Sequence, residues 1–241
     1  MDHSQEFLRI CKKNGLRIDE GQFDLFRYYV RLLLDWNSKI NLVSRRDVEN
    51  IWFSHILHSL APWFGLWLPS GWAVLDIGSG GGLPGIPLAI LRSDLNILLL
   101  DSKEKKTKVL AEILSELKLR NVQVVNGRAE DVGRSGDYAC RFSAVLARGV
   151  APLTDLIRWA RPFVCQRVGG LSEAELQRVE PGKRLLDAPS LLAWKGGDLE
   201  YEIKHASRSL PREKIEVLPL VIKGIQSPGL EEKQLVLISF G

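Results

Sequence analysis

A glycine-rich turn is the part of this sequence best suited to hold a ligand. Gly78, Gly80 and Gly82 directly follow the apolar run 73–77. Glycine lets a backbone turn tightly and approach a ligand where a Cβ atom would obstruct it. Pro84 suits the first turn of a following helix, because its missing N–H would be unpaired there. This order of strand, turn and helix predicts a nucleotide-type cofactor site at the carboxyl edge of a parallel sheet.

The charge beside the turn favours one cofactor over another. Gly80, Gly82 and Gly85 match the dinucleotide fingerprint G-x-G-x-x-G, a weak signal in a chain with 21 glycines. Asp76, two residues before the first glycine, would repel a pyrophosphate but suits a positively charged ligand. S-adenosylmethionine has a sulfonium, an ammonium and no phosphate, and D-I-G-S-G-G-G resembles motif I of the Rossmann-like methyltransferases that use it. We expect Asp76 near the ammonium; a nicotinamide-dependent oxidoreductase is the alternative.

Polar residues also follow the next two predicted strands. Asp101 lies 19 residues beyond Gly82, where such folds place an acid on the ribose hydroxyls. It could instead cap the following helix, although Ser102 would serve equally. Ala129 and Glu130 follow the third strand and could read the adenine edge, or belong to a solvated acidic loop.

Basic residues at the fourth and fifth strands could serve the ligand or the substrate. Arg148 directly follows a buried-looking strand, where an unpaired charge would be costly. It could grip the cofactor carboxylate, position the target nucleotide, or pair with Asp76. Lys195 ends the fifth strand and could contact a substrate phosphate or be solvated. Further candidates for RNA phosphates are the surface-type residues Arg45, Arg46 and Arg141.

Some catalytic features are missing from the sequence. His55 and His58 lie one helical turn apart without a suitably spaced third ligand, so we expect no metal site. Residues 148–153 contain no N-P-P-Y-like turn, and no cysteine is placed as a nucleophile for pyrimidine C5. A target with a free lone pair and no proton to lose, such as guanine N7, fits a site without base or nucleophile.

Hydrophobic periodicity predicts the elements that carry these residues. Residues 1–70 read as a helical cap, with a capping box at Asp19 and Gln22 and a third helix from Asp47. Residues 71–241 alternate strands and helices, which predicts an α/β doubly wound sheet. Its predicted strands are 73–77, 96–100, 122–125, 143–147 and 191–194, closed by an antiparallel hairpin of 214–222 and 234–240. Residues 165–189 break the alternation and read as an insertion.

Composition excludes several classes. The 241 residues are 45% hydrophobic and 26% charged, ordinary values for a globular protein. No apolar run approaches the roughly 20 residues that cross a bilayer, and residues 1–6 do not resemble a signal peptide. Three widely spaced cysteines (Cys11, Cys140, Cys165) predict reduced thiols and a cytoplasmic protein. The net charge of +4 permits an RNA partner without arguing for one.

A longer set of motifs resembles one bacterial family. Trp36–Leu42 resembles its W-N-x-x-x-N-L signature, followed by D-I-G-S-G-G-G-L-P-G-I-P-L, R-A-E-D and L-A-R. The family is the small-subunit rRNA guanine-N7 methyltransferase G, formerly called glucose-inhibited division protein B. The resemblance implies S-adenosylmethionine-dependent methylation of guanine N7 in the decoding-region stem-loop of 16S rRNA. By motif position, it implies cofactor contacts at Gly78, Leu83, Ala129, Glu130 and Arg148.

The sequence departs from that family in the third helix, after L-A-R, and in a connection at 165–189 that is longer than usual. Where the family usually has R-H and D-S-L, this chain has Ser54-His55 and His58-Ser59-Leu60, and Gly149 replaces an alanine after L-A-R. We expect 16S rRNA or the small ribosomal subunit as partner, no membrane contact, and a monomer. An enzyme of the same fold that acts on tRNA or a small molecule is the other alternative.

Overall fold

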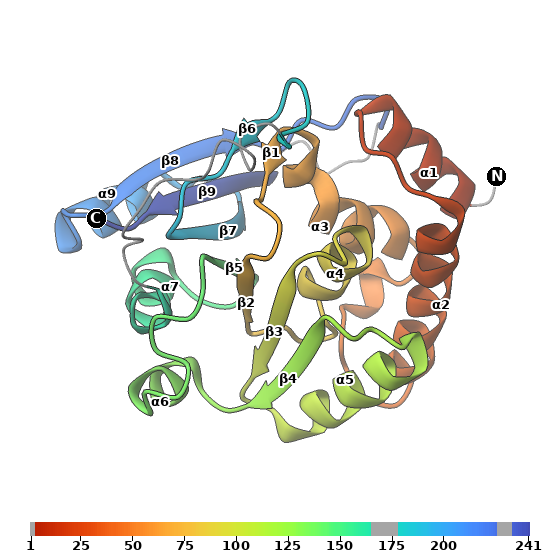
Figure 1. Ribbon diagram of the computed structural model, residues 1–241, viewed down its shortest axis with the longest axis horizontal. Coiled ribbons are helices and arrows are strands. Elements are labelled where there is room, and N and C mark those ends of the chain that lie inside the picture. The colour runs from red at the N-terminus through yellow and green to blue at the C-terminus, as the bar shows by residue number, and fades with distance from the viewer. Residues whose placement is uncertain (1–2, 165–177, 226–232) are drawn as a thin grey trace.

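A largely parallel sheet runs through the middle of the molecule (Figure 1). The computed structural model describes residues 3–164, 178–225 and 233–241, and within them the sheet has seven strands in the order β4-β3-β2-β5-β7-β9-β8. Six of these strands run in one direction, and β9 runs in the opposite direction between β7 and β8. The strands are β2 (Ala73–Ile77), β3 (Asn96–Asp101), β4 (Val122–Asn126), β5 (Ala144–Arg148), β7 (Ser190–Gly196), β8 (Lys214–Pro219) and β9 (Lys233–Ser239).

The order of the strands creates a crevice beside β2. The strand that follows β2 in the chain, β3, lies on one side of it, and β5 lies on the other. Connections from these strands therefore leave in opposite directions, which opens a ligand site at their carboxyl ends. The predicted Rossmann-like sheet, closed by an antiparallel pair, is confirmed.

Helices cover both faces of the sheet (Figure 1). One face carries α4 (Gly85–Leu91) and α5 (Glu104–Leu117), with α1 (His3–Lys13) and α2 (Glu20–Asn37) outside them. The other face carries α6 (Ala129–Arg134), α7 (Leu153–Ala160) and α9 (Glu200–Ser209).

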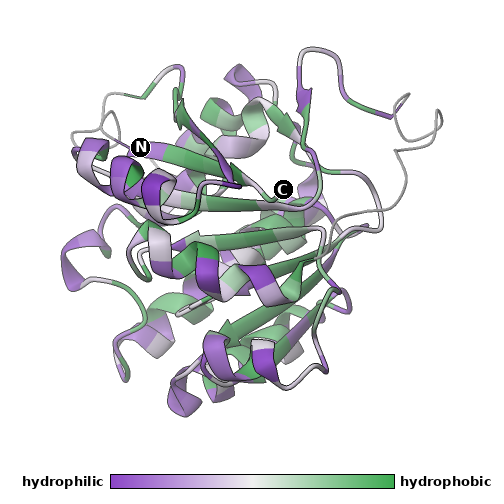
Figure 2. Cartoon of the chain, turned by 90° about the vertical axis from the view of Figure 1, so that its left-hand side faces the viewer, coloured by the Kyte–Doolittle hydropathy of each residue, from purple (hydrophilic) through white to green (hydrophobic). Residues whose placement is uncertain are grey.

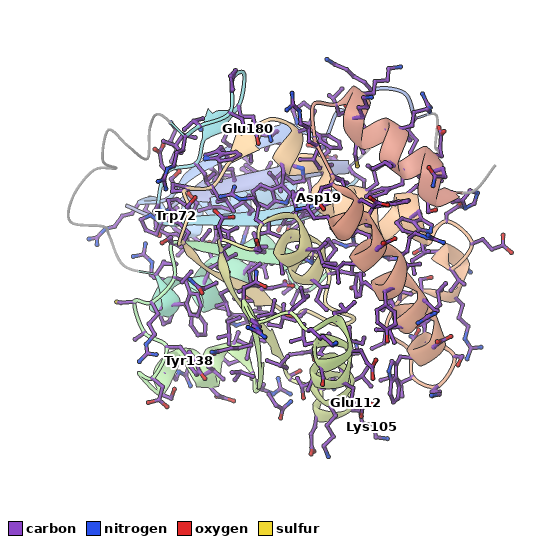
Figure 3. All side chains as sticks on the ribbon, turned by 45° about the vertical axis from the view of Figure 1, so that its right-hand side comes forward. Asp19, Trp72, Lys105, Glu112, Tyr138 and Glu180 are labelled. Carbon is purple, nitrogen blue, oxygen red and sulfur yellow. The ribbon has the colours of Figure 1, made fainter. Side chains whose placement is uncertain are left out.

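Each face of the sheet has its own apolar core. Val74 packs into the core shared with α1, α2, α4 and α5, while Leu75 and Ile77 pack into the core on the other face. This follows from the two-residue repeat of a strand, and Figure 2 shows the strands mostly hydrophobic. The helices are amphipathic: Lys105 and Glu112 project outward from α5 (Figure 3), whereas its apolar side faces the core.

The helical cap is tied to the sheet domain at the start of α2. The predicted capping box is confirmed: Gln22 N donates to Asp19 Oδ1 at 2.8 Å, and Gln22 Oε1 accepts from Asp19 N at 3.1 Å. Figure 3 shows Asp19 at this end of the helix. Gln22 Nε2 also donates to the carbonyls of Ile90 and Leu91 in α4. The division into a cap (1–70) and a methyltransferase domain (71–241) stays a prediction, although one core joins the two.

The predicted third helix is wrong in form. A short 3-10 helix η1 (Arg45–Asp47) comes first, then a π-helix η2 (Trp52–Leu57), α3 (His58–Leu60) and a 3-10 helix η3 (Ala61–Phe64). Side chains take part in this widened turn, because the His55 carbonyl accepts hydrogen bonds from Ser59 Oγ (2.6 Å) and Arg148 (3.1 Å). Arg148 lies 93 positions from His55 in the sequence. The local hydrophobic pattern therefore could not predict that its hydrogen bond helps to form a π-helix.

Several elements were not predicted. β1 (Leu66–Trp67) pairs in parallel with β6 (Arg184–Leu185), and α9 lies between β7 and β8 in the chain. A 3-10 helix, η4 (Arg161–Phe163), follows α7. The predicted insertion at 165–189 includes β6, while its residues 165–177 lie outside the described residues.

The expectation of three reduced cysteines is wrong for Cys140, which is disulfide-bonded, whereas Cys11 is free and buried. Cys140 lies in a turn beside the end of α7, where its N–H donates to the Pro162 carbonyl at 3.1 Å. Spacing along the chain gave no sign of such proximity in the fold. Within the three described ranges, no helix has both the length and the apolar character to cross a membrane.

Candidate cofactor and substrate site

The glycine turn after β2 requires glycine for two different reasons. Gly78, Gly80 and Gly82 all have positive φ angles, of 70°, 58° and 94°, which other residues adopt only with strain. A Cβ on Gly78 would lie 2.7 Å from Val150 Cγ2, and one on Gly82 would lie 2.4 Å from Ile86 Cδ1. At Gly80 the nearest atom would be 3.9 Å away. A side chain at Gly78 or Gly82 would therefore have to displace Val150 or Ile86, whereas a Cβ at Gly80 would make only ordinary van der Waals contacts.

Asp101 holds this turn against β3. Its Oδ2 accepts a hydrogen bond from Gly80 N at 2.9 Å, and its Oδ1 accepts one from Lys103 N at 2.8 Å. The interpretation of Ser102 as the cap of α5 is wrong: Lys103 is the capping residue and makes no side-chain capping bond. Asp101 therefore fixes the glycine turn and the entry to α5 together, and its contact with a ribose stays a prediction.

Asp76 lies beneath the turn and is fully buried. Its Oδ2 accepts a hydrogen bond from Gly85 N at 2.9 Å, at the start of α4, and Ser79 Oγ donates to its carbonyl at 2.8 Å. Burial raises the pKa of Asp76 to about 7, against the lowering effect of the Gly85 bond. The carboxylate thus supports the helix that follows the turn. Its predicted approach to a cofactor ammonium stays a prediction.

The helical cap reaches the turn from the other side. Asn37 Oδ1 accepts hydrogen bonds from the N–H groups of Leu42 and Val43, at 2.8 and 2.9 Å. The loop so formed places Leu42 Cβ 3.4 Å from a Cβ position on Gly81. The W-N-x-x-x-N-L motif therefore shapes one wall of the turn. Tyr29, which the sequence suggested only as core, also contacts the turn, because its hydroxyl donates to the Gly81 carbonyl.

The remaining predicted cofactor residues lie at the same edge of the sheet. Leu83 is buried, and its N–H donates to the Ser79 carbonyl at 2.9 Å. Ala129 and Glu130 begin α6, directly after β4. Since β2, β3 and β4 are parallel neighbours, their carboxyl ends meet at one edge. The structure therefore brings the glycine turn, Asp101, Ala129 and Glu130 together.

Arg148 points toward the helical cap. Its guanidinium donates to the His55 carbonyl and to Ser59 Oγ, both at 3.1 Å, and contacts His55 Nδ1. Burial lowers the pKa of Arg148 to about 10, while Tyr29 and Asp76 act against that change. Its hydrogen bonds thus join the end of β5 to the π-helix.

A cavity of about 490 Å³ lies between the cap and the carboxyl ends of β5 and β7. Burial lowers the pKa of His55 to about 4 and of His58 to about 3, so both imidazoles are neutral at physiological pH. Within the described residues, no group of three or more histidine, cysteine or acidic side chains could hold a metal. The residues that line the cavity are Asp47, Ser54, His55, His58, Arg148, Gly149, Trp194, Lys195, Gly196 and Lys233.

Lys195 is engaged within the protein. Its Nζ donates to the Ala151 carbonyl at 2.8 Å and to Glu202 Oε1 at 2.6 Å. The same Glu202 oxygen accepts from Leu153 N at the start of α7. Lys195 and Glu202 therefore hold the segment after β5 whose Val150 side chain packs on Gly78. Glu202 lies in α9, the helix that the sequence pattern did not reveal.

The three arginines predicted to contact RNA occupy different places. Arg45 and Arg46 are exposed on η1, next to Asp47 at the cavity. Arg141 shares a separate cavity with Ala73, the first residue of β2. Its guanidinium lies 5.9 Å from the ring centre of Tyr138, which Figure 3 shows far from α2. Arg141 thus lies at the amino ends of the strands, opposite the glycine turn.

The strand order, together with a glycine turn after β2, defines a Rossmann-like methyltransferase. Residues 22–171 match the family model described as rRNA small subunit methyltransferase G. The chain belongs to this family. It is 33% identical over 241 residues to the ribosomal RNA small subunit methyltransferase G of Moorella thermoacetica, covering 98% of this chain and 90% of the relative. The corresponding protein of Chlorobium luteolum is 35% identical over 246 residues, covering 98% and 91%.

Among solved structures, the chain is similar to TYW2 of M. jannaschii in complex with AdoMet, with a TM-score of 0.49 and 15% identity. That match covers 83% of this chain and 77% of the other.

Proposed function

We propose that this protein transfers a methyl group from S-adenosylmethionine to N7 of a guanine in the decoding-region stem-loop of 16S rRNA. Family membership supports the reaction and the ribosomal RNA substrate. The observation that carries the proposal is the convergence of the glycine turn, Asp101 and the start of α6 at one edge, beside a cavity with cationic walls.

The residues at this edge fit S-adenosylmethionine. Gly80 has no side chain to obstruct the close approach of a ligand, and its left-handed backbone is held by the bond to Asp101. The backbone of residues 78–83 would hold the methionine part, Asp101 the ribose, and Ala129 with Glu130 the adenine. When bound, the cofactor supplies an electrophilic methyl group on a sulfonium.

The reaction needs no general base in this chain. Guanine N7 has a free lone pair and loses no proton on methylation, so positioning and electrostatics suffice. The neutral imidazoles of His55 and His58 agree with this, because they add no positive charge beside a base that becomes cationic. Arg148 would position the target nucleotide or the cofactor carboxylate from the end of β5. The partner is 16S rRNA or the small ribosomal subunit, and the enzyme acts as a monomer in the cytoplasm.

The test is methyl transfer from labelled S-adenosylmethionine to small ribosomal subunits that lack the modification. Naked rRNA and tRNA run in parallel, and the product is mapped by strand cleavage at N7-methylguanine. The expected result is one labelled guanine in the decoding-region loop. Label on tRNA alone, or cofactor binding without transfer to any rRNA substrate, would overturn the rRNA assignment.

A further inference from the structure

We propose that the cavity between the helical cap and the ends of β5 and β7 binds a phosphate group of the RNA strand that carries the target guanine. This inference rests on the proposed function and names the part of the substrate that the cavity takes. It assigns His58 and Lys233 as residues that contact the phosphate, while the positive charge of Arg148 in the cavity wall attracts it.

Three separate parts of the chain build the cavity. The cap contributes Ser54, His55 and His58. The end of β5 contributes Arg148 and Gly149. Two neighbouring strands, β7 and β9, contribute Lys195 and Lys233. Trp194 Nε1 donates to the His58 carbonyl at 2.9 Å and so fixes the cap against β7. At about 490 Å³, the cavity has room for a nucleoside phosphate.

The charges of the walls favour an anion. Lys195 is balanced by its bond to Glu202 at 2.6 Å. The two other cations are Arg148 and Lys233, and the negative charge of Asp47 offsets one of their two positive charges. The Asp47 side chain is 42% exposed, and its carboxylate lies 3.5 Å from His55 Nε2. Counted over the described residues, the walls therefore keep about one net positive charge, which favours binding of a phosphodiester.

The cavity lining includes a buried polar atom that has no partner among the described residues. His58 is 6% exposed, and its Nε2 has no hydrogen-bond partner among the described residues. Orphaned buried polar atoms are rare and cost free energy unless a ligand or water satisfies them. Both Arg148 and Lys233 lower the pKa of His58, which shows that their charges act at its ring. In the tautomer with the proton on Nε2, neutral His58 donates to a phosphate oxygen that the two cations attract.

The position of the cavity suits a strand that presents its base to the cofactor. Gly149 lines the cavity, and the next residue, Val150, packs against Gly78 of the glycine turn. A phosphate held in the cavity therefore places its nucleotide beside the turn. Exposed Arg45 and Arg46, next to Asp47, could take further phosphates of the same strand.

The test uses two kinds of substitution and compares guanosine 5′-monophosphate with guanosine. In calorimetric titrations the monophosphate should bind at least tenfold more tightly than guanosine. Lys233→Gln should weaken binding of an rRNA stem-loop about tenfold and reduce the slope of log K against log salt by about 0.7–0.9. Lys214→Gln, an equal loss of charge on exposed β8, should change either quantity much less.

His58 tests the phosphate contact independently of charge, because a neutral side chain affects RNA affinity without affecting its dependence on salt. His58→Leu should weaken RNA binding without changing the salt slope, and His58→Gln, which keeps a donor, should restore most of the affinity. Affinity for S-adenosylhomocysteine should stay unchanged in every variant, which also confirms folding.

Equal binding of guanosine and its monophosphate would overturn the proposal. Competition between S-adenosylhomocysteine and the monophosphate would also overturn it, and would assign the cavity to the cofactor carboxylate. If the monophosphate binds more tightly than guanosine and does not compete with S-adenosylhomocysteine, but no rRNA is methylated, only the proposed function would be overturned.

Discussion

The hydroxyl of Tyr29 in α2 donates a hydrogen bond to the carbonyl of Gly81 at 2.8 Å, and the tyrosine is fully buried. This bond joins the helical cap to the backbone of the glycine turn. Together with the Asp101 bond to Gly80 N, it holds the turn from two sides. The conformation of the cofactor turn therefore depends on the cap as well as on the sheet.

Replacing Tyr29 should loosen the turn. Tyr29→Phe leaves the buried Gly81 carbonyl without its donor, which should lower the free energy of unfolding by about 1–3 kcal/mol. Affinity for S-adenosylhomocysteine should fall as well. Tyr28→Phe is the matched control, since the Tyr28 hydroxyl bonds Glu116 at the surface. Denaturant titration and calorimetry measure the two effects, and equal behaviour of both variants would contradict the role of Tyr29.

A methyl group on Gly80 should block the cofactor. Gly80→Ala and Gly71→Ala both place alanine at a positive φ, 58° and 78°, and neither Cβ meets an atom closer than 3.9 Å. Both variants should therefore lose a similar stability of about 1–2 kcal/mol. Only Gly80→Ala should lose more than tenfold in S-adenosylhomocysteine affinity. Unchanged affinity in that variant would remove Gly80 from the cofactor site.

Glu202 should act on the cofactor turn through the segment after β5. Glu202→Ala removes the acceptor of both Lys195 Nζ and Leu153 N, so Val150 loses its support against Gly78. We expect a several-fold higher KM for S-adenosylmethionine with a smaller change in kcat. Glu200→Ala, an exposed acid in the same helix turn, is the control. A change in kcat alone would show that Glu202 acts on another step.

His58 should make the protein more sensitive to acid. Its pKa is about 3 in the folded protein and 6.5 in the unfolded chain, so between these two pH values mainly the unfolded chain binds the proton. The stability contribution is complete above pH 6.5 and is lost as the pH falls toward 3, by at most about 1.4 kcal/mol per pH unit. Arg148, Lys233 and His55 all act in the same direction on His58.

The measurement is the free energy of unfolding of the wild type and of His58→Gln between pH 4.5 and 8. The wild type should lose stability more steeply than the variant below pH 6.5, and the two curves should run parallel above it. Parallel curves over the whole range would mean that the imidazole titrates normally.

Local patterns were sufficient for the parts of the site that are made by consecutive residues. The glycine turn, the strands beside it and the capping box of α2 each follow from short-range periodicity and steric limits. Asp101 was placed correctly at the edge, but its two bonds to backbone N–H groups depend on a neighbouring strand. The π-helix, the orientation of Arg148 and the cavity around His58 were not predictable, because they depend on contacts between residues 89 to 136 positions apart in the chain.

The position of β9 has a consequence for synthesis of the chain. β9 lies between β7 and β8, although both of those strands precede it. Until residues 233–239 have been made, β8 has no neighbour in the sheet and the carbonyls and N–H groups on one side of β7 stay unpaired. A nascent chain that stops before β9 therefore exposes two open strand edges, which makes that stage the one most prone to aggregation.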